Sequence, residues 1–266
     1  FGIKNNFNLY LKNLNSVAKN DEIYTSDVQI DGKSIMEFNT TFPLLKLKNK
    51  YTETLTPKIS FRINPGNNMS NHTGSSSIIT AKNAFDINRL GIGSDFEAGK
   101  SITLGVDYKF DLLENNQFKD TSEEEDIKDK FIELKLATVV RDEYEVNIPK
   151  NSTINRKNSN LFGSINNQLF DNVNFSYNFS LDNDFKTIES NKITSEISVN
   201  NFVTTFNFVE RRNELGSTHL LSNVTKYKVN DNYSFKFATS RNKEINLTEY
   251  YDLSFEYKND CLTAAL

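Results

Sequence analysis

The stretch Asn172–Asp182 reads NVNFSYNFSLD and alternates without a break between apolar and polar residues. In a helix these apolar residues would be spread around the whole circumference. Strict alternation over this length therefore predicts a β-strand with one dry side and one wet side. The dry side consists of Val173, Phe175, Tyr177, Phe179 and Leu181, and the wet side of Asn172, Asn174, Ser176, Asn178, Ser180 and Asp182.

The same period of two recurs along most of the chain and predicts about 13 strands with almost no amphipathic helix. Clear alternation marks 59–63, 102–110, 233–237 and 251–257, weaker alternation marks 6–15, 28–42, 131–141, 161–169, 188–199, 202–210 and 218–229, and a last strand begins at 262.

Short and long connections alternate between these strands. Short polar turns occupy 170–171, 200–201, 230–232 and 259–260, and longer polar segments occupy 64–88, 142–160, 211–216 and 242–249. Transmembrane β-barrels have this arrangement, with short periplasmic turns and longer extracellular loops. The segment 111–130, with the acidic run Glu123–Asp126, is too long for the short turn expected there. We interpret it as a flexible insertion of undetermined role.

Composition favours a barrel over a soluble enzyme. Hydrophobic residues make up 37% of the chain, below the roughly 45–50% of globular proteins, and a barrel with a wet lumen needs only one apolar face. No apolar run approaches the ~20 residues of a transmembrane helix. A net charge of −4 gives no support for a nucleic-acid partner. We therefore predict an all-β, antiparallel transmembrane β-barrel that is incomplete, an open curved sheet whose two ends continue in a longer protein.

A soluble β-sandwich used as a binding module would also alternate, and it is one alternative. Long strands and scarce Gly and Pro argue against it. Aromatic residues near strand ends, as in the girdles of membrane barrels, argue against it as well. These are Phe162, Phe170, Tyr250 and Tyr251.

No catalytic or metal-binding constellation stands out, so we expect neither an enzyme nor a cofactor. The two histidines, His72 and His219, lack zinc-binding spacing and are interpreted as solvated residues. The single cysteine, Cys261, cannot form an internal disulfide. It is either an idle thiol or one half of a bridge to a segment outside this chain.

Three stretches resemble the C-terminal barrel domain of the LPS-assembly protein (LptD) family. The first, Phe85–Phe110, contains the Asn88-Arg89 pair before a Gly-rich strand. The second, Phe131–Asp142, is followed by a loop and a hairpin through SLDND at 180–184. The third, Leu247–Leu266, is similar to a late hairpin whose turn carries cysteine. Their order and spacing also agree with the family.

The resemblance implies that residues 1–266 are part of the barrel domain of an outer-membrane lipopolysaccharide (LPS) translocon of Gram-negative bacteria. It implies that the N-terminal jellyroll and the first and last barrel strands lie outside this chain. The implied partners are LPS, a plug lipoprotein inside the barrel, and periplasmic bridge proteins that reach the missing N-terminal domain. A passive porin or uptake channel is the alternative within membrane barrels.

The resemblance also implies a role for Cys261 in an interdomain disulfide at the periplasmic rim. Many family members have an adjacent pair of cysteines there, whereas this chain has Asp260 before its single Cys261. One or two bridges therefore remain open, as do the strand register and the LPS chemotype.

Strand alternation assigns residues to the two faces of the expected wall. The residues expected to face lipid are Phe175, Tyr177, Phe179, Phe235 and Phe255, and those expected to face the lumen are Asn174, Ser176, Asn178, Lys236 and Glu256. Which lumen residues touch LPS, the plug or only water is left open.

Overall fold

A computed structural model describes residues 2–17, 19, 27–66, 69–74, 77–113, 130–213 and 216–266. The described part is all-β, apart from one turn of 3-10 helix, η1 (Lys150–Ser152). None of its helical residues forms a segment long and apolar enough to cross a membrane. The strands are β1 (Lys4–Ser16), β2 (Gln29–Thr41), β3 (Leu44–Leu47), β4 (Tyr51–Ile63), β5 (Lys100–Leu112), β6 (Lys130–Arg141), β7 (Leu161–Phe170), β8 (Val173–Leu181), β9 (Ile188–Val199), β10 (Phe202–Asn213), β11 (Gly216–Lys228), β12 (Tyr233–Asn242), β13 (Leu247–Lys258) and β14 (Thr263–Ala265).

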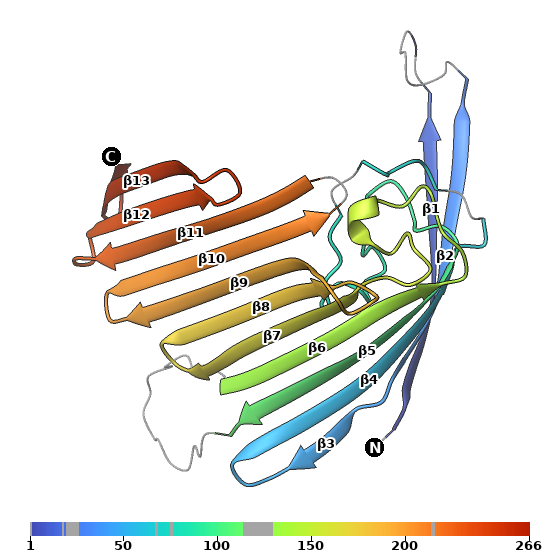
Figure 1. Cartoon of the computed structure of the whole chain (residues 1–266), viewed down its shortest axis with the longest axis horizontal. Helices are drawn as coiled ribbons and strands as arrows, with labels where there is room; N and C mark the ends of the chain where they lie inside the picture. Colours follow the sequence, from blue (N-terminus) through green and yellow to red (C-terminus); the bar gives the residue numbers. More distant parts are fainter. Residues whose placement is uncertain are drawn as a thin grey trace. The chain divides into compact units, whose positions relative to one another are not determined.

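The described strands form one 14-stranded antiparallel sheet in which chain neighbours are also sheet neighbours (Figure 1). The order runs from β1 through β2 and β4 to β14, and β3 pairs with β4. Among the described strands, β1 and β14 do not pair with each other, so the path is open. The predicted all-β fold with an open antiparallel sheet is confirmed, and the two packed sheets of a sandwich are absent from the described strands.

The expected number of about 13 strands was one too low, because β3 was missed. Pro43 has no backbone N–H and interrupts the ladder after β2, while the backbone N–H of Phe42 donates to the carbonyl of Pro57 at 3.0 Å. The four residues Leu44–Leu47 then pair with β4. A run of this length is too short to display a period of two, which explains the error.

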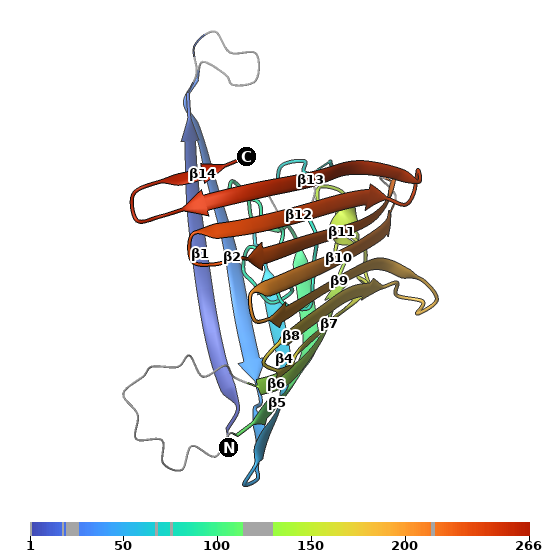
Figure 2. The same cartoon turned by 90° about the vertical axis from the view of Figure 1, so that its left-hand side faces the viewer.

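The chain divides into two compact units, and several strands contribute to both. Residues 1–43, 56–106 and 136–162 form unit 1, and residues 44–55, 107–135 and 163–266 form unit 2. Within unit 1, β1 and β2 make a long hairpin in continuous register from Lys4↔Thr41 to Ser16↔Gln29. Within unit 2, the strands from β8 to β14 follow one another in chain order (Figure 2). The acidic run Glu123–Asp126 lies outside the described residues.

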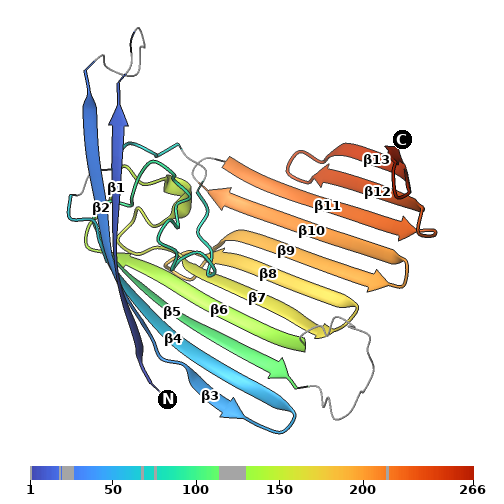
Figure 3. The ribbon, with the colours of Figure 1, turned by 180° about the vertical axis from the view of Figure 1, so that it is seen from behind.

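Unit 1 has a hydrophobic core made largely by its two long loops, 64–99 and 142–160, which gather over the same strands (Figure 3). The sequence suggested long polar loops here, but both loops contribute buried apolar residues to this core, and that they lie on the extracellular side stays a prediction. Phe162 was expected in an interfacial girdle, yet it is only 2% exposed within this core. The buried members are Met69, Ile79, Ala81, Ala84, Leu90, Ala98, Ala137, Val139, Ile148, Ile154 and Phe162.

Loop 64–99 is fitted closely to the strands beneath it at Gly105 of β5. A Cβ added to Gly105 would lie 2.6 Å from the Phe85 ring and 2.8 Å from the carbonyl oxygen of Leu136. Only glycine leaves room for the Phe85 ring at this point. The ring also lies 4.7 Å from Nζ of Lys58, within cation–π range.

Candidate functional site

On β4 and β5 of unit 1, apolar side chains are exposed and polar side chains are buried, the reverse of the pattern in a water-soluble domain. On β4, Phe61 is 41% exposed while its neighbour Arg62 is only 2% exposed. On β5, Leu104 is exposed while Thr103 is buried. On these two strands, apolar side chains thus lie on the open face, and polar side chains lie on the face that the folded loops cover. An exposed apolar face of this kind marks a surface that is covered by lipid or a partner.

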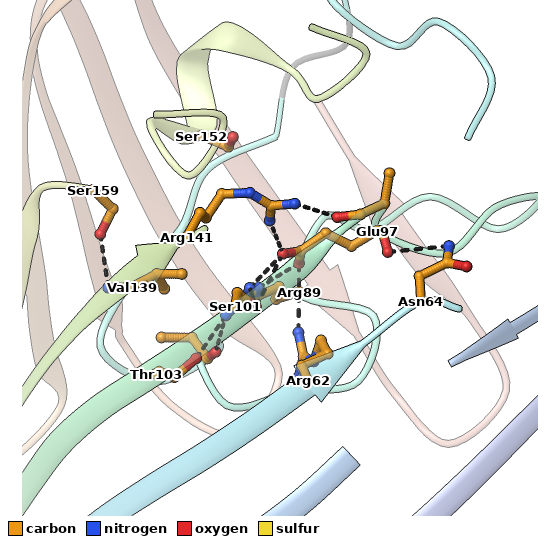
Figure 4. Close-up of polar contacts among 12 residues, drawn as sticks. Arg62, Asn64, Arg89, Glu97, Ser101, Thr103, Val139, Arg141, Ser152 and Ser159 are labelled. Carbon is orange, nitrogen blue, oxygen red and sulfur yellow. Dashed lines mark hydrogen bonds and ion pairs between the residues drawn. The ribbon is translucent and has the colours of Figure 1, made fainter. Parts of the chain in front are cut away.

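Glu97 is the centre of a buried ion cluster between loop 64–99 and the strands (Figure 4). Its carboxylate accepts hydrogen bonds from Nε of Arg89 at 2.6 Å and from Nη2 of Arg89 at 2.5 Å. Nη1 of Arg141 also donates to it, and Nη1 of Arg62 lies 3.5 Å away. Loop, β4 and β6 therefore meet at one carboxylate.

Further contacts tie Arg62 and Arg89 to neighbouring strands of the sheet. Nη2 of Arg62 donates to Oε2 of Glu37 on β2 at 2.6 Å. Arg89 donates to Oγ1 of Thr103 at 2.8 Å and to Oγ of Ser101 at 3.0 Å, both on β5. Because both buried carboxylates are engaged by guanidinium groups, the cluster holds the loop in place and offers no free acid or base.

The cluster shifts the pKa values of its own loop residues. Burial alone would raise the pKa of Glu97, but the charges and hydrogen bonds of Arg89, Arg141 and Arg62 hold it far below its ordinary value. For Arg89, burial is the main cause of a pKa lowered to about 10, and the adjacent Glu97 opposes this shift. At neutral pH both groups are ionised, as a buried ion pair requires.

Asp95 makes a second buried attachment of the same loop. It accepts a hydrogen bond from Nζ of Lys33 on β2 at 2.7 Å and one from the backbone N–H of Ser70 at 2.8 Å. Nε2 of His72 lies 3.1 Å from Oδ2 of Asp95, the oxygen that also accepts the bond from Ser70. Burial would raise the pKa of Asp95, but these bonds lower it on balance. The interpretation of His72 as a solvated loop residue is therefore wrong.

In unit 2 the strand register shows which residues share a face of the sheet from β8 to β13. Ser176 lies opposite Thr194, which lies opposite Asn207, and the series continues through Ser222 to Ser240 on β12. By the same registers, Phe175 begins a second row of cross-strand partners, which continues with Ser195, Phe206, Asn223 and Thr239. Residues two apart on a strand share a face, so each face can be followed across six strands.

The ten residues that the sequence assigned to two faces divide into the same two groups on opposite sides of the sheet. Phe235 and Phe255 lie opposite each other, with ring centroids 5.1 Å apart, on the face of Phe175. Lys236 and Glu256 are both exposed on the opposite face. Tyr177 and Phe179 share the face of Phe175, and Asn174 and Asn178 share the face of Ser176. That the first face meets lipid stays a prediction.

The polar face of unit 2 carries chains of hydrogen-bonded side chains. Asn178 donates to Ser176 at 3.4 Å, Ser176 donates to Asn166 at 2.9 Å, and Asn166 donates to Glu133 at 3.2 Å. Residues with hydroxyl, amide and carboxylate groups can exchange such bonds with sugar hydroxyls or water. The face is thus suited to a hydrated interior.

The apolar face of unit 2 carries an aromatic belt next to the short turns. Tyr51, just after the turn from β3 to β4, stacks on Phe110 at 5.2 Å. Tyr233, just after the turn from β11 to β12, lies 5.7 Å from Phe255 and 5.1 Å from Tyr257. Aromatic belts of this kind lie at membrane interfaces.

Cys261 is exposed and free, in the turn between β13 and β14. Oδ1 of Asn259 accepts hydrogen bonds from the backbone N–H of Cys261 at 3.0 Å and of Leu262 at 2.8 Å. The turn places Cys261 outside any strand, and its pairing stays a prediction. Within the described residues, no group of three or more His, Cys, Asp or Glu side chains could hold a metal ion.

Sequence reasoning missed the ion cluster, although Arg89 belongs to the Asn88-Arg89 pair on which the resemblance rested. The signal in the sequence was weak, because Arg62, Glu97 and Arg141 are separated by 35 and 44 residues. One local sign was Arg62, a single arginine on the polar side of the amphipathic strand β4.

Comparison with known proteins agrees with the resemblance. No curated protein matches the chain. A family model described as LPS transport system D, LptD, matches residues 5–259. This family acts in LPS transport and assembly, its members are outer-membrane proteins, and it is not a known enzyme family. Because the match covers nearly the whole chain, the chain belongs to the LptD family.

Proposed function

We propose that this chain is part of the barrel wall of a translocon that inserts LPS into the outer leaflet of a Gram-negative outer membrane. The observation that carries the proposal is the two-faced sheet, with an exposed apolar face and a polar face lined by hydrogen-bonding side chains. LPS has both an acyl part and a hydrophilic sugar part. A wall of this kind allows the acyl part to stay in lipid on one side and the sugar part to stay in water on the other.

The partners follow from the same proposal. Residues 1–266 would belong to the C-terminal barrel domain, whose N-terminal jellyroll and first and last strands lie elsewhere in the protein. A plug lipoprotein would occupy the lumen, and periplasmic bridge proteins would deliver LPS through the jellyroll. A disulfide from Cys261 to that periplasmic domain would fix the delivery domain against the barrel, and the oxidising periplasm favours such a bridge.

Depletion of the full-length protein tests the proposal. With its gene under conditional control, newly made, pulse-labelled LPS should stop reaching the cell surface, where an impermeant antibody detects it. Uptake of a small hydrophilic dye should not change over the same period. If LPS delivery continues while dye uptake falls, the protein is a passive porin or uptake channel and the proposal is wrong.

A further inference from the structure

A chain of polar side chains interrupts the apolar face of unit 2 between the middle of β8 and the long-loop ends of β9 to β11. Oη of Tyr177 donates to Oδ1 of Asn191 at 2.7 Å, and Nδ2 of Asn191 donates to Oε2 of Glu210 at 3.2 Å. Asn191 lies opposite Phe179 on one side and Glu210 on the other. These groups therefore share the face of the phenylalanines and do not line the polar face.

Two side chains that can donate hydrogen bonds, those of Arg212 and His219, complete this row. Nη2 of Arg212 donates to Oε1 of Glu210 at 2.7 Å, and His219 lies directly opposite Glu210. The Arg212 side chain is 67% exposed, so its remaining N–H groups point to the surroundings. The ring of His219 lies edge-on to Phe208 at 5.3 Å. We call Tyr177, Asn191, Glu210, Arg212 and His219 the polar row.

The polar row lies at the opposite strand ends from the aromatic belt. On β10, Phe202 lies opposite Tyr227 beside the short turns, and Glu210 follows eight positions later. Eight residues span about 27 Å along a strand, or about 20 Å across the membrane for a strand tilted by ~40°. An outer-membrane apolar band is about 25 Å tall, so the polar row lies at the far edge of such a band.

We propose that the polar row binds the phosphate groups of LPS headgroups in the outer leaflet, with Arg212 and His219 as the donors. The inference rests on the proposed function, since it takes the apolar face to meet lipid and the long-loop end to face outward. Arginine is well suited to phosphate, because its planar guanidinium can donate several hydrogen bonds to one group. Glu210 acts as a positioning residue that fixes the direction of Arg212.

Among the described residues of this face, the carboxylates of Glu189 and Glu210, beside the proposed phosphate site, are both engaged within the chain. Glu210 is engaged by Arg212 and Asn191. Glu189, two residues before Asn191 on β9, already has an interaction partner within the chain. The most exposed charged group of the row is therefore cationic.

A photocrosslinker at Phe208 tests this inference in the full-length protein. Benzoylphenylalanine at Phe208 would lie beside His219, and its adduct with LPS can be detected by immunoblotting after reconstitution in vesicles of phosphatidylcholine and LPS. Arg212→Gln should lower the adduct about tenfold, the loss expected for one charge-assisted hydrogen bond. Arg211→Gln is the matched control, because Arg211 precedes Arg212 and points to the opposite face.

A second arm keeps the test independent of how the variants fold. With arginine retained, enzymatically dephosphorylated LPS should lower the adduct at least as much as Arg212→Gln does, because it removes the acceptor of both donors. Equal adduct yields for intact LPS, dephosphorylated LPS and Arg212→Gln would overturn the inference. Pulse-labelled LPS delivery by cells with the unaltered protein distinguishes the two claims, because its absence contradicts the proposed function and its presence leaves only the phosphate site at issue.

Discussion

Replacing Glu97 by Gln should release loop 64–99 from the sheet while the strands stay paired. Gln keeps the shape of the side chain but removes the charge that Arg89, Arg141 and Arg62 share. The variant leaves three buried guanidinium groups with the single carboxylate of Glu37. Removing one partner of a buried ion pair costs about 3–5 kcal/mol.

That cost can be measured as loop opening. About 3–5 kcal/mol corresponds to a rise of roughly a hundredfold to several-thousandfold in the opening equilibrium. Hydrogen exchange followed by peptide mass spectrometry should therefore show lost protection in 69–99, with little change in β9 to β12. Glu53→Gln is the matched control, because Glu53 pairs with Lys46 on the surface and surface pairs contribute only ~0–1 kcal/mol.

The pH dependence has a definite sign. The folded pKa of Glu97 lies far below its ordinary value of 4.5. The ionised side chain therefore contributes its full stabilisation of the closed loop above about pH 4.5. This stabilisation is lost as the pH falls from there toward the folded pKa. Protection of the loop should thus hold at pH 6 and decline below about pH 4.5, and Glu97→Gln should flatten this decline. Equal loop protection in Glu97→Gln and Glu53→Gln would refute the role given to the cluster.

Three further changes test other parts of the structure. Gly105→Val should displace the Phe85 ring, which lies 2.6 Å from the Cβ position, and should raise protease cleavage within 77–99; unchanged cleavage would contradict the close packing. Phe206→Arg should lower folding stability in lipid by ~2–4 kcal/mol, because Phe206 is 45% exposed midway between aromatic belt and polar row. Asn207→Arg on the opposite face should cost about 1 kcal/mol, the worth of its hydrogen bond from Thr194, and equal costs would show that the face assignment is wrong. Cys261→Ser should change the migration of the full-length protein on non-reducing electrophoresis, and identical migration with no disulfide-linked peptide would exclude an interdomain bridge.

The strands could be predicted from the sequence because their cause is local. In β8 each residue faces the side that its polarity prefers, so the period of two is visible in eleven consecutive letters, Asn172–Asp182. The same holds for β5 and β13. By contrast, β4 starts at Tyr51, well before the alternation that was recognised at 59–63. The first half of this strand was not predicted because its Thr residues and Pro57 hide the alternation.

The candidate site could be predicted only in part. The two faces of unit 2 follow from alternation alone, whereas the fold of the loops depends on contacts between distant residues. Glu97 and Arg141 meet only because β5 and β6 bring the two loops together. The polar row was missed for a similar reason, since Asn191 and Glu210 look like isolated interruptions until the register places them side by side.

The central claim is that this sheet separates lipid from a hydrated interior, and cysteine labelling along β8 tests it most directly. Single cysteines would be introduced at each position from Asn174 to Phe179 in the full-length protein, in intact outer membranes, and treated with a water-soluble maleimide. The account predicts a period of two, with labelling at Asn174, Ser176 and Asn178 and protection at Phe175, Tyr177 and Phe179. Uniform labelling at all six positions would contradict it, because both faces would then be in water.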